Sequence, residues 1–405
     1  MKRQFINNDP QRGILYDWKV IRKRLHALGI PTIYYNPASA PLDKCQWFVE
    51  LSERATGKTT GWLLCGLVMF DEYGTVTMYV RQKKDMIAPK NASSIFNVVV
   101  ENGYIEKLTN GEYNNVFYKS KKWYLCHVDP DTGEITKKHP EYFCRMISID
   151  DSTNLKSACN EPYGDLIIFD EFVSTWTPSN EFVTFVDVVS TVFRLRECGK
   201  IVMLANTIDK YNQYFHDLEI FERIATMETS DNCIHTTDKG TRIYIEFIGP
   251  PKVYKSKKAR WTKLFAGFKK PELASITGEA TWAVKCYQHI PDITNPDTDA
   301  PTTLFRNVYI YHKNKFVRLD FVLHPENGLC LYIHWATKCH DDSYIFTLEE
   351  MYDRRYTYGL PRNTTLGGLV HKLIDQHKVY FTANDVGAFF ENYMIESDRM
   401  NLRHF

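Results

Sequence analysis

The sequence lacks the features that mark membrane and secreted proteins. It contains no apolar run of about 18 residues, the length that a membrane-crossing helix needs, and the longest candidate covers only residues 61–70. The first residues, MKRQFINNDPQRG, have no apolar core of the kind found in signal peptides. These absences predict a cytoplasmic protein without membrane contact.

Paired cysteines are also missing. The ten cysteines are scattered and include no C-x-x-C pair. Cys65, Cys198 and Cys330 lie in apolar surroundings, so we expect small buried thiols, as in a reducing compartment. Two Cys-His dipeptides, at 126–127 and 339–340, have no partner pair at zinc spacing, so we predict no metal there.

An excess of charge is absent as well. Lysine and arginine number 50 against 49 acidic residues, which gives a net charge of +1. The chain is therefore not globally basic, and any contact with nucleic acid must come from local patches. With 405 residues, it is long enough for two or three domains with a large core.

The stretch QWFVELSERATGKTT organises the chain. It predicts a short strand over residues 47–51, a tight loop, and a helix that opens at the GKT sequence. Apart from a serine at its first position, the loop fits the Walker A pattern G-x-x-x-x-G-K-[ST]. Such a loop points backbone N–H groups and a helix N-terminus at a phosphate. For GKT alone, an ordinary turn before a helix is equally consistent. The candidate nucleotide-binding residues are Ser52, Glu53, Arg54, Ala55, Thr56, Gly57, Lys58, Thr59 and Thr60.

Two further apolar strands end in polar residues. DLIIFDE, at 165–171, reads as a buried parallel strand with the Walker B pattern. We expect Thr59 and Asp170 to hold Mg²⁺ and Glu171 to polarise the attacking water. KIVMLANT, at 200–207, would place Asn206 where a γ-phosphate is sensed. The three strands predict an α/β P-loop NTPase core of the ASCE type, with a mostly parallel sheet that binds ATP and Mg²⁺.

Other candidates have competing interpretations. Tyr35 and its neighbour Tyr34 are suitably placed to cover an adenine, and simple packing is at least as consistent. Residues 180–197 follow helical spacing and end with Arg194 and Arg196. These arginines either complement the helix dipole or reach a neighbouring subunit as an arginine finger.

A lysine-rich segment precedes the predicted strand DLIIFDE. Residues 114–149 predict a β-rich insertion with a turn at 129–133. Its lysines suit either a DNA backbone or a solvated hairpin edge, and we weigh the two evenly. The candidate DNA-binding residues are Lys119, Lys121, Lys122, Lys137 and Lys138.

The remaining chain changes character twice. Residues 249–270 interleave lysines with aromatic residues after Gly-Pro-Pro, which favours a linker, with nucleic-acid contact as a second role. From residue 302 a β-β-β-α-β order suggests a smaller ribonuclease-H-like α/β domain. We expect an ATPase domain over 1–248, a basic linker or lid over 249–300, and a nuclease-like domain over 301–405.

With these stretches placed, the sequence resembles the DNA-packaging ATPases of phi29-like podoviruses, a kind of terminase-like motor. The likeness covers most of residues 30–290. Its quoted segments are Tyr35-Asn36-Pro37 before the loop, Arg54 within it, MYVRQKKDM, Lys156-Ser157 before DLIIFDEF, then LANT and YNQYF. Ser52 departs from the glycine of the family pattern.

The resemblance implies a homomeric ring, expected to be pentameric, docked on the portal of a viral prohead. Such a ring threads double-stranded DNA into the shell with ATP, in the host cytoplasm and transiently at the prohead vertex. A scaffold RNA is a further partner that the sequence leaves open. Carried over by position, Lys58 and Thr59 bind phosphate and Mg²⁺, Asp170 supports the metal, and Glu171 is the catalytic base. Arg54, Lys156 and either Arg194 or Arg196 match basic positions that act in cis or across the subunit interface.

The nuclease-like domain departs from active terminases. Their first strand ends in Asp-Pro-Ala, where this sequence has His334-Trp335-Ala336. At the later strand, Thr382 or Asn384 stands at the position of the acid, with Asp385 nearby. Such a site needs several carboxylates around two metals, so we predict a vestigial domain that binds the prohead, DNA or a scaffold RNA. The alternatives are a terminase with an active nuclease and a non-catalytic portal or capsid adaptor.

Overall fold

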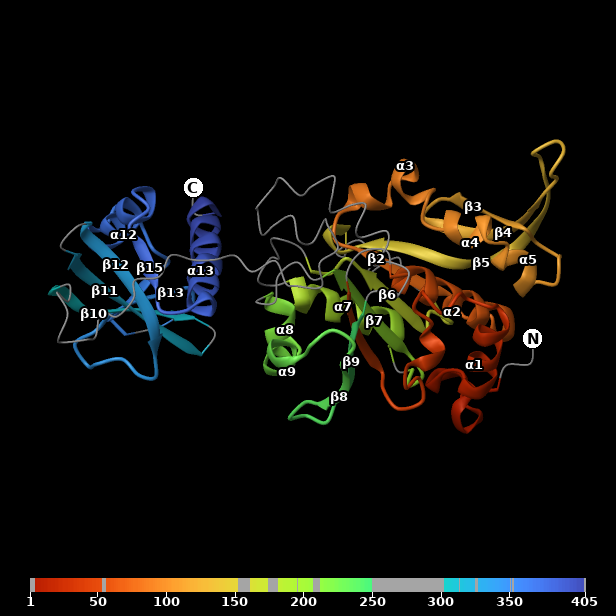
Figure 1. Ribbon diagram of the computed structural model, residues 1–405, viewed down its shortest axis with the longest axis horizontal. Coiled ribbons are helices and arrows are strands. Elements are labelled where there is room, and N and C mark those ends of the chain that lie inside the picture. The colour runs from red at the N-terminus through yellow and green to blue at the C-terminus, as the bar shows by residue number, and fades with distance from the viewer. Residues whose placement is uncertain are drawn as a thin grey trace. The chain divides into compact units, whose positions relative to one another are not determined.

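The computed structural model of the protein forms two compact units, Met1–Val284 and Lys285–Phe405 (Figure 1). The structure describes residues 4–52, 56–151, 161–173, 181–194, 196–206, 212–249, 302–312, 314–324, 327–349, 351 and 353–403. Within these ranges, no helix combines the length and apolar character that a membrane crossing requires. The expected linker over 249–300 lies, apart from its first residue, outside the described residues and stays a prediction.

The first unit is built on a nine-stranded sheet in the order β3-β4-β5-β2-β6-β7-β1-β9-β8. The strands are β1 (Trp47–Ser52), β2 (Thr77–Arg81), β3 (Asn115–Lys119), β4 (Lys122–Val128), β5 (Ile135–Ser148), β6 (Leu166–Asp170), β7 (Lys200–Asn206), β8 (Asn232–Thr236) and β9 (Arg242–Ile248). The six strands from β5 to β9 in this order pair in parallel, and antiparallel strands flank them on both sides. The predicted mostly parallel α/β core is confirmed.

The lysine-rich segment is more closely joined to this sheet than an insertion would be. The carboxyl-terminal half of β5 pairs in parallel with β2 from Cys144 to Ser148. Its other half forms an antiparallel ribbon with β4. The segment therefore extends the central sheet, and its long strand connects the core to the hairpins.

Helices cover both faces of the sheet, so the unit has three layers: helices, sheet and helices (Figure 1). They are α1 (Trp18–Ala27), α2 (Lys58–Tyr73), α3 (Pro89–Ala92), α4 (Asn97–Glu101), α5 (Tyr104–Leu108), α7 (Glu181–Phe193), α8 (Gln213–Asp217) and α9 (Phe221–Thr226). One core joins alternate strand residues to α1, α2, α4 and α5, and the other joins the opposite face to α7, α8 and α9. The strands are apolar on both faces because both faces are covered.

The helix after the phosphate loop lies unusually close to the sheet. A Cβ atom at Gly66 of α2 would come within 2.2 Å of the Thr77 side chain on β2, so only glycine allows this approach. The helix is buried on nearly all sides, which agrees with its continuous apolar sequence. Its amino-terminal end is thereby fixed against the sheet edge.

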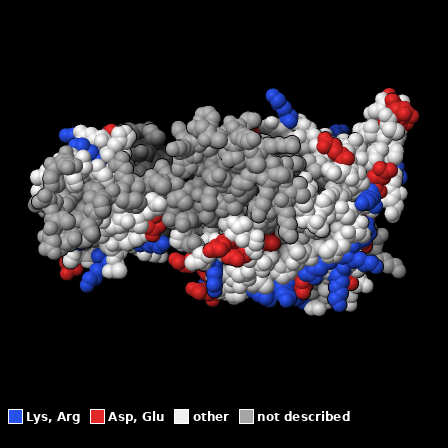
Figure 2. All heavy atoms as spheres, in the orientation of Figure 1, with Lys and Arg blue, Asp and Glu red and all other residues white. Residues whose placement is uncertain are grey.

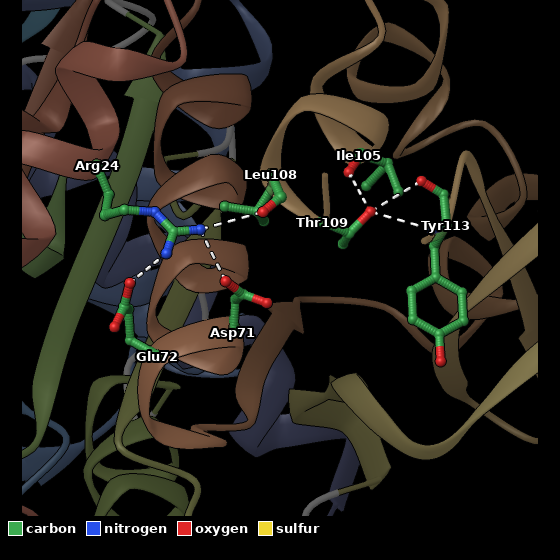
Figure 3. Close-up of polar contacts among 7 residues, drawn as sticks. All are labelled: Arg24, Asp71, Glu72, Ile105, Leu108, Thr109 and Tyr113. Carbon is green, nitrogen blue, oxygen red and sulfur yellow. Dashed lines mark hydrogen bonds and ion pairs between the residues drawn. The ribbon is translucent and has the colours of Figure 1, made fainter. Parts of the chain in front are cut away.

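A polar network ties the helices of this layer together (Figure 3). Arg24 of α1 donates to Asp71 at 2.7 Å, pairs with the adjacent Glu72, and donates to the Leu108 carbonyl at 3.1 Å. One guanidinium thus joins the ends of α2 and α5. Thr109 closes the turn after α5: its hydroxyl lies 2.9 Å from the carbonyl oxygens of both Ile105 and Tyr113 and donates its one proton to either of them.

The second unit has a six-stranded sheet in the order β14-β13-β10-β11-β12-β15. Its elements are β10 (Thr302–His312), β11 (Lys315–His324), β12 (Gly328–Ala336), β13 (Tyr344–Thr347), β14 (Tyr356–Tyr358), α12 (Thr365–Asp375), β15 (Val379–Phe381) and α13 (Asn384–Arg403). The predicted β-β-β-α-β succession is present with two more strands than expected: the strand-like run over 307–324 is divided into β10 and β11, and β14 lies between the expected β13 and α12. β12 and β15 are parallel neighbours.

Two helical segments are interrupted by particular residues. Residues 89–101 form two short helices, α3 and α4, and Ser93 and Ser94 between them bond to carbonyls three residues back. Short polar side chains compete with the helical backbone in this way. The helix predicted over 180–197 corresponds to α7 (Glu181–Phe193). It ends at Phe193 because Arg194 adopts a φ of 51°. Arg196 therefore lies beyond the helix.

Candidate nucleotide-binding site

The polar ends of three parallel strands meet at one edge of the first sheet. Ser52 at the end of β1 pairs in register with Asn206 at the end of β7. Asp170 at the end of β6 pairs with Leu204 of β7. Ligands of open α/β sheets bind at this carboxyl edge. The predicted convergence of these strand ends is confirmed.

The lysine of the loop bridges two of these strands. The Lys58 amino group donates to the Ser52 hydroxyl and to the Asn206 side-chain oxygen, both at 2.9 Å. It is thereby held at the carboxyl edge of the sheet, in the first turn of α2. Gly57, with a φ of 86°, caps α2 in the left-handed conformation that favours glycine. Glu53, Arg54 and Ala55 lie outside the described residues.

Ser52 replaces the glycine of the sequence pattern and has a contact role of its own. Its side chain is buried at the end of β1. The hydroxyl accepts from Lys58 and forms a second hydrogen bond with the Thr56 hydroxyl at 2.8 Å. The serine thus connects the two ends of the loop, an interaction that a glycine could not make.

Thr59 and Asp170 present oxygen atoms to a common position. The Thr59 hydroxyl donates to the Asp170 carboxylate at 3.2 Å. Thr59 lies in the first turn of α2, next to Lys58, and Thr60 follows it. A hydroxyl and a carboxylate are the hard oxygen ligands that Mg²⁺ prefers beside a phosphate. The two side chains therefore fit the expected metal.

Tyr79 and Arg81, both on β2, complete the acidic end of the site. The Tyr79 hydroxyl donates to Asp170 at 2.5 Å. Arg81 donates to Glu171 at 2.5 Å and lies 3.3 Å from Asp170. Although burial opposes it, the nearby Tyr79, Asp170 and Glu171 raise the pKa of Arg81, so the guanidinium remains charged. Sequence reasoning named neither as a site residue, although both lie in the MYVRQKKDM segment that carries part of the family resemblance.

Glu171 is exposed and conformationally strained. Its φ of 58° lies in the left-handed region, which costs a residue with a side chain about 1–2 kcal/mol. Its side chain is 53% exposed, against 6% for Asp170. The carboxylate is thus exposed at the sheet edge, where it accepts a hydrogen bond from Arg81. Strained backbone of this kind is concentrated at functional sites.

Tyr35 does not take the position predicted for it. Its side chain is 7% exposed, and its hydroxyl donates to Glu50 in the core at 2.5 Å. The ring therefore packs inside the protein and does not cover an adenine. Tyr34 is 41% exposed and lies against Gly57, so it is the residue of this pair with a surface available to a base.

The two candidate finger arginines have different surroundings. Arg196 donates to Asp165 at 2.5 Å, and the side chains of this pair are 8% and 0% exposed. Asp165 precedes β6, whereas Asp170 ends it, and five strand residues span about 17 Å. Arg196 is thus a buried residue at the opposite edge of the sheet. Arg194 is exposed, and its guanidinium forms no ion pair with any described residue.

The predicted lysine cluster is divided between two ends of a ribbon. Lys119 and Lys121 lie at the turn between β3 and β4, and Lys122 is paired with Arg145 near the carboxyl end of β5. Lys137 and Lys138 lie seven or more residues before Arg145 on β5, which places them roughly 23 Å from it.

The far end of that ribbon is not a basic surface. Lys137 is paired with Glu112 at 2.7 Å, and Lys138 lies over the Phe117 ring. Figure 2 shows acidic side chains at the tip of the hairpin between β4 and β5, which carries Asp131 and Glu134. Of the five predicted lysines, those at the β3–β4 turn are nearest to the edge that carries the nucleotide site. Lys156, another predicted catalytic residue, lies outside the described residues.

Comparison with known proteins identifies the architecture. The chain is similar in structure to the phi-28 gp11 DNA packaging motor, with 12% sequence identity and a TM-score of 0.57 over 89% of this chain and 97% of that chain. It is also similar to the bacteriophage phi-29 viral genome packaging motor assembly, with 18% identity and a TM-score of 0.54 over 89% of this chain and 100% of that chain. No protein-family model and no curated protein matches the sequence. The chain therefore has the fold of phage genome-packaging motor proteins.

Proposed function

We propose that the protein is an ATP-driven viral genome-packaging motor that translocates double-stranded DNA into a prohead. The observation that carries the proposal is the convergence of Lys58, Thr59, Asp170 and Asn206 at one sheet edge. The shared fold with packaging motors supports the same function. A non-catalytic adaptor would have no use for an exposed acid directly after the metal-binding aspartate.

Each side chain has a defined part in the proposed hydrolysis. Lys58 neutralises the outer phosphates, and Asn206 holds Lys58 and senses the γ-phosphate. Thr59 and Asp170 hold Mg²⁺, which when bound neutralises charge on the phosphate oxygens. Glu171 orients the attacking water and accepts its proton, while Arg81 fixes the carboxylates of Asp170 and Glu171.

The proposed working form is a homomeric ring, pentameric by analogy with the family, docked on a prohead portal in the host cytoplasm. The exposed Arg194 is the residue that supplies the trans-acting finger. Its position after α7 lets it leave its own subunit without breaking an internal ion pair. A scaffold RNA between ring and prohead belongs to the same proposal.

The full chain is expected to hydrolyse ATP with Mg²⁺, and double-stranded DNA is expected to raise the rate. Steady-state phosphate release, with and without DNA, measures both effects. The adaptor alternative predicts no turnover in any assembly state, with or without proheads. Measured turnover that DNA leaves unchanged would retain the ATPase and reject the motor.

DNA contact is proposed for the turn that carries Lys119 and Lys121. Each phosphate contact adds about one to the slope of log affinity against log salt concentration, so replacing both lysines with alanine should reduce the slope by about two. The matched control is Lys137→Ala with Lys138→Ala, whose side chains already contact Glu112 and Phe117. Equal effects of the two double variants in a salt titration would contradict the assignment.

A working nuclease is not part of the proposal, because two acids of the second unit are on opposite faces of its sheet. His334 pairs with Asp320 at 3.1 Å, and the next residue, Trp335, donates to Asp385 at 2.8 Å. Consecutive strand residues point to opposite faces. Asp320 also forms an ion pair with Arg318. The same protein preparation should leave supercoiled plasmid intact with Mn²⁺, and nicking that Asp385→Ala abolishes would favour the terminase alternative.

A further inference from the structure

Two glutamates lie side by side beneath the candidate nucleotide site. Glu50 of β1 is paired in register with Glu246 of the parallel neighbour β9, and neighbouring strands are about 4.8 Å apart. The Glu50 side chain is completely buried. Glu50 is two residues before Ser52, so the pair is directly below the phosphate loop.

Hydroxyl groups and apolar atoms surround this carboxyl pair. Tyr35 donates to one Glu50 oxygen at 2.5 Å, and Tyr244 donates to Glu246 at 3.0 Å. The other Glu50 oxygen has no hydrogen-bond partner, although the nearby indole of Trp62 opposes the rise in the pKa of Glu50. Within the described residues, no lysine or arginine forms an ion pair with either glutamate.

The remaining titratable groups facing the pair do not neutralise it. Lys58 of α2 is the nearby cation, and its amino group is engaged with Ser52 and Asn206. Cys65 of α2 is buried, which raises the pKa of its thiol to about 12, and Cys233 of β8 is paired in register with Ile245, on the other face of the sheet from Tyr244. Glu50 is buried and Glu246 is half-buried, so two negative charges on this pair would repel each other.

Burial, followed by the charge of Glu246, raises the pKa of Glu50 well above its ordinary value. Burial also raises the pKa of Glu246. Both shifts favour a neutral form. Because Glu246 acts on the ionisation of Glu50, loss of a second proton from the pair is opposed by loss of the first.

Tyr35 connects this pair to the phosphate loop. Its backbone N–H donates to the Thr56 carbonyl at 2.9 Å. Its carbonyl lies so close to α2 that a Cβ atom at Gly61 would be 2.9 Å from it. The preceding residue, Tyr34, rests on Gly57. A movement of the Tyr35 ring would therefore displace the backbone on which the loop rests.

We propose that Glu50 is a positioning residue for the nucleotide site: together with Glu246 it takes up a single proton, and it accepts a hydrogen bond from the Tyr35 hydroxyl, which keeps residues 34–37 against the phosphate loop. This inference rests on the proposed function, since it assigns a role in nucleotide binding. Loss of the proton at higher pH places two negative charges together. The Tyr35 segment then shifts and the loop binds nucleotide less tightly.

The test compares wild-type protein with Glu50→Gln, which keeps the size and hydrogen bonding of the side chain and cannot ionise. Affinity for a non-hydrolysable ATP analogue with Mg²⁺ is measured from pH 6 to 9. Wild-type affinity should fall with rising pH, by at most about tenfold per pH unit above the pKa of the pair. Glu50→Gln should remove that part of the pH dependence. Glu222→Gln, an exposed glutamate on α9, is the matched control and should behave as wild type.

A second readout does not require nucleotide. Because the pKa of Glu50 is higher in the folded than in the unfolded protein, its contribution to stability is greatest below its ordinary pKa and is lost as pH rises through the folded value. The melting temperature of Glu50→Gln should therefore fall less between pH 6 and 9. Buried Glu181, whose pKa is also raised by burial, contributes equally to both proteins and cancels in the comparison.

Tyr35→Phe supplies a variant that separates the two effects. It keeps both carboxyls and the buried ring, so the pH dependence of stability should remain while that of affinity disappears. Equal pH slopes of affinity in wild type and Glu50→Gln, with binding intact, would overturn the role of Glu50 alone. Absence of nucleotide binding by either protein would overturn the proposed function and this role with it.

Discussion

Glu171→Gln is expected to abolish ATP turnover while leaving ATP binding intact. The substitution keeps the shape of the side chain and removes the carboxylate that accepts a proton from the attacking water. General-base catalysis contributes about 10²–10⁴ in rate, so the turnover number should fall by that factor. Binding should survive because Lys58, Thr59 and Asp170, which hold the phosphates and Mg²⁺ in the proposed site, are unchanged.

The measurement pairs single-turnover hydrolysis with equilibrium binding of ATP and Mg²⁺. Lys58→Ala provides the contrast: it removes the amino group that bridges Ser52 and Asn206, and it should weaken binding as well as hydrolysis. Glu134→Gln, in the exposed turn between β4 and β5, controls for the loss of any surface carboxylate. Normal hydrolysis by Glu171→Gln would show that another group is the base and that the acidic end of the site is wrongly assigned.

The sequence predicted the parts of the site that depend on local pattern. An apolar run that ends in polar residues identifies a buried parallel strand and the edge where its end lies. β1, β6 and β7 were placed in this way, and their ends meet as expected. The start of α2 at Lys58 followed from glycine and lysine spacing in the same manner.

The parts that were missed depend on neighbours distant in sequence. Tyr79 and Arg81 belong to the site only because β2 is the neighbour of β6, and strand order is not written in the residues of β2. Tyr35 has an aromatic side chain of the kind that stacks on a base, yet its hydrogen bond to Glu50 makes it part of the core. The five lysines look like one cluster in sequence because a β-ribbon returns on itself with its ends far apart.

Arg194→Ala is expected to lose activity in the assembled ring and keep its stability, whereas Arg196→Ala is expected to lose stability. Arg194 is exposed beyond α7, so its removal should leave the melting temperature of the isolated chain unchanged. As a finger reaching a neighbouring subunit, it would account for about 10³–10⁵ in the rate of the assembled ring. Arg196 contacts Asp165 with both side chains buried, and removal of one partner of such a pair costs about 3–5 kcal/mol in the free energy of unfolding.

Three measurements distinguish the roles of the two arginines. They are thermal unfolding of the isolated chain, turnover of the assembled ring, and turnover of rings mixed from Arg194→Ala and Glu171→Gln subunits. Mixed rings should regain activity at interfaces where an intact Arg194 meets an intact Glu171, because finger and base then come from different subunits. Arg196→Met combined with Asp165→Asn should recover part of the lost stability by removing the uncompensated buried charge. A stable Arg196→Ala chain whose rings are inactive would instead make Arg196 the finger, and it would require the contact with Asp165 to open when subunits assemble.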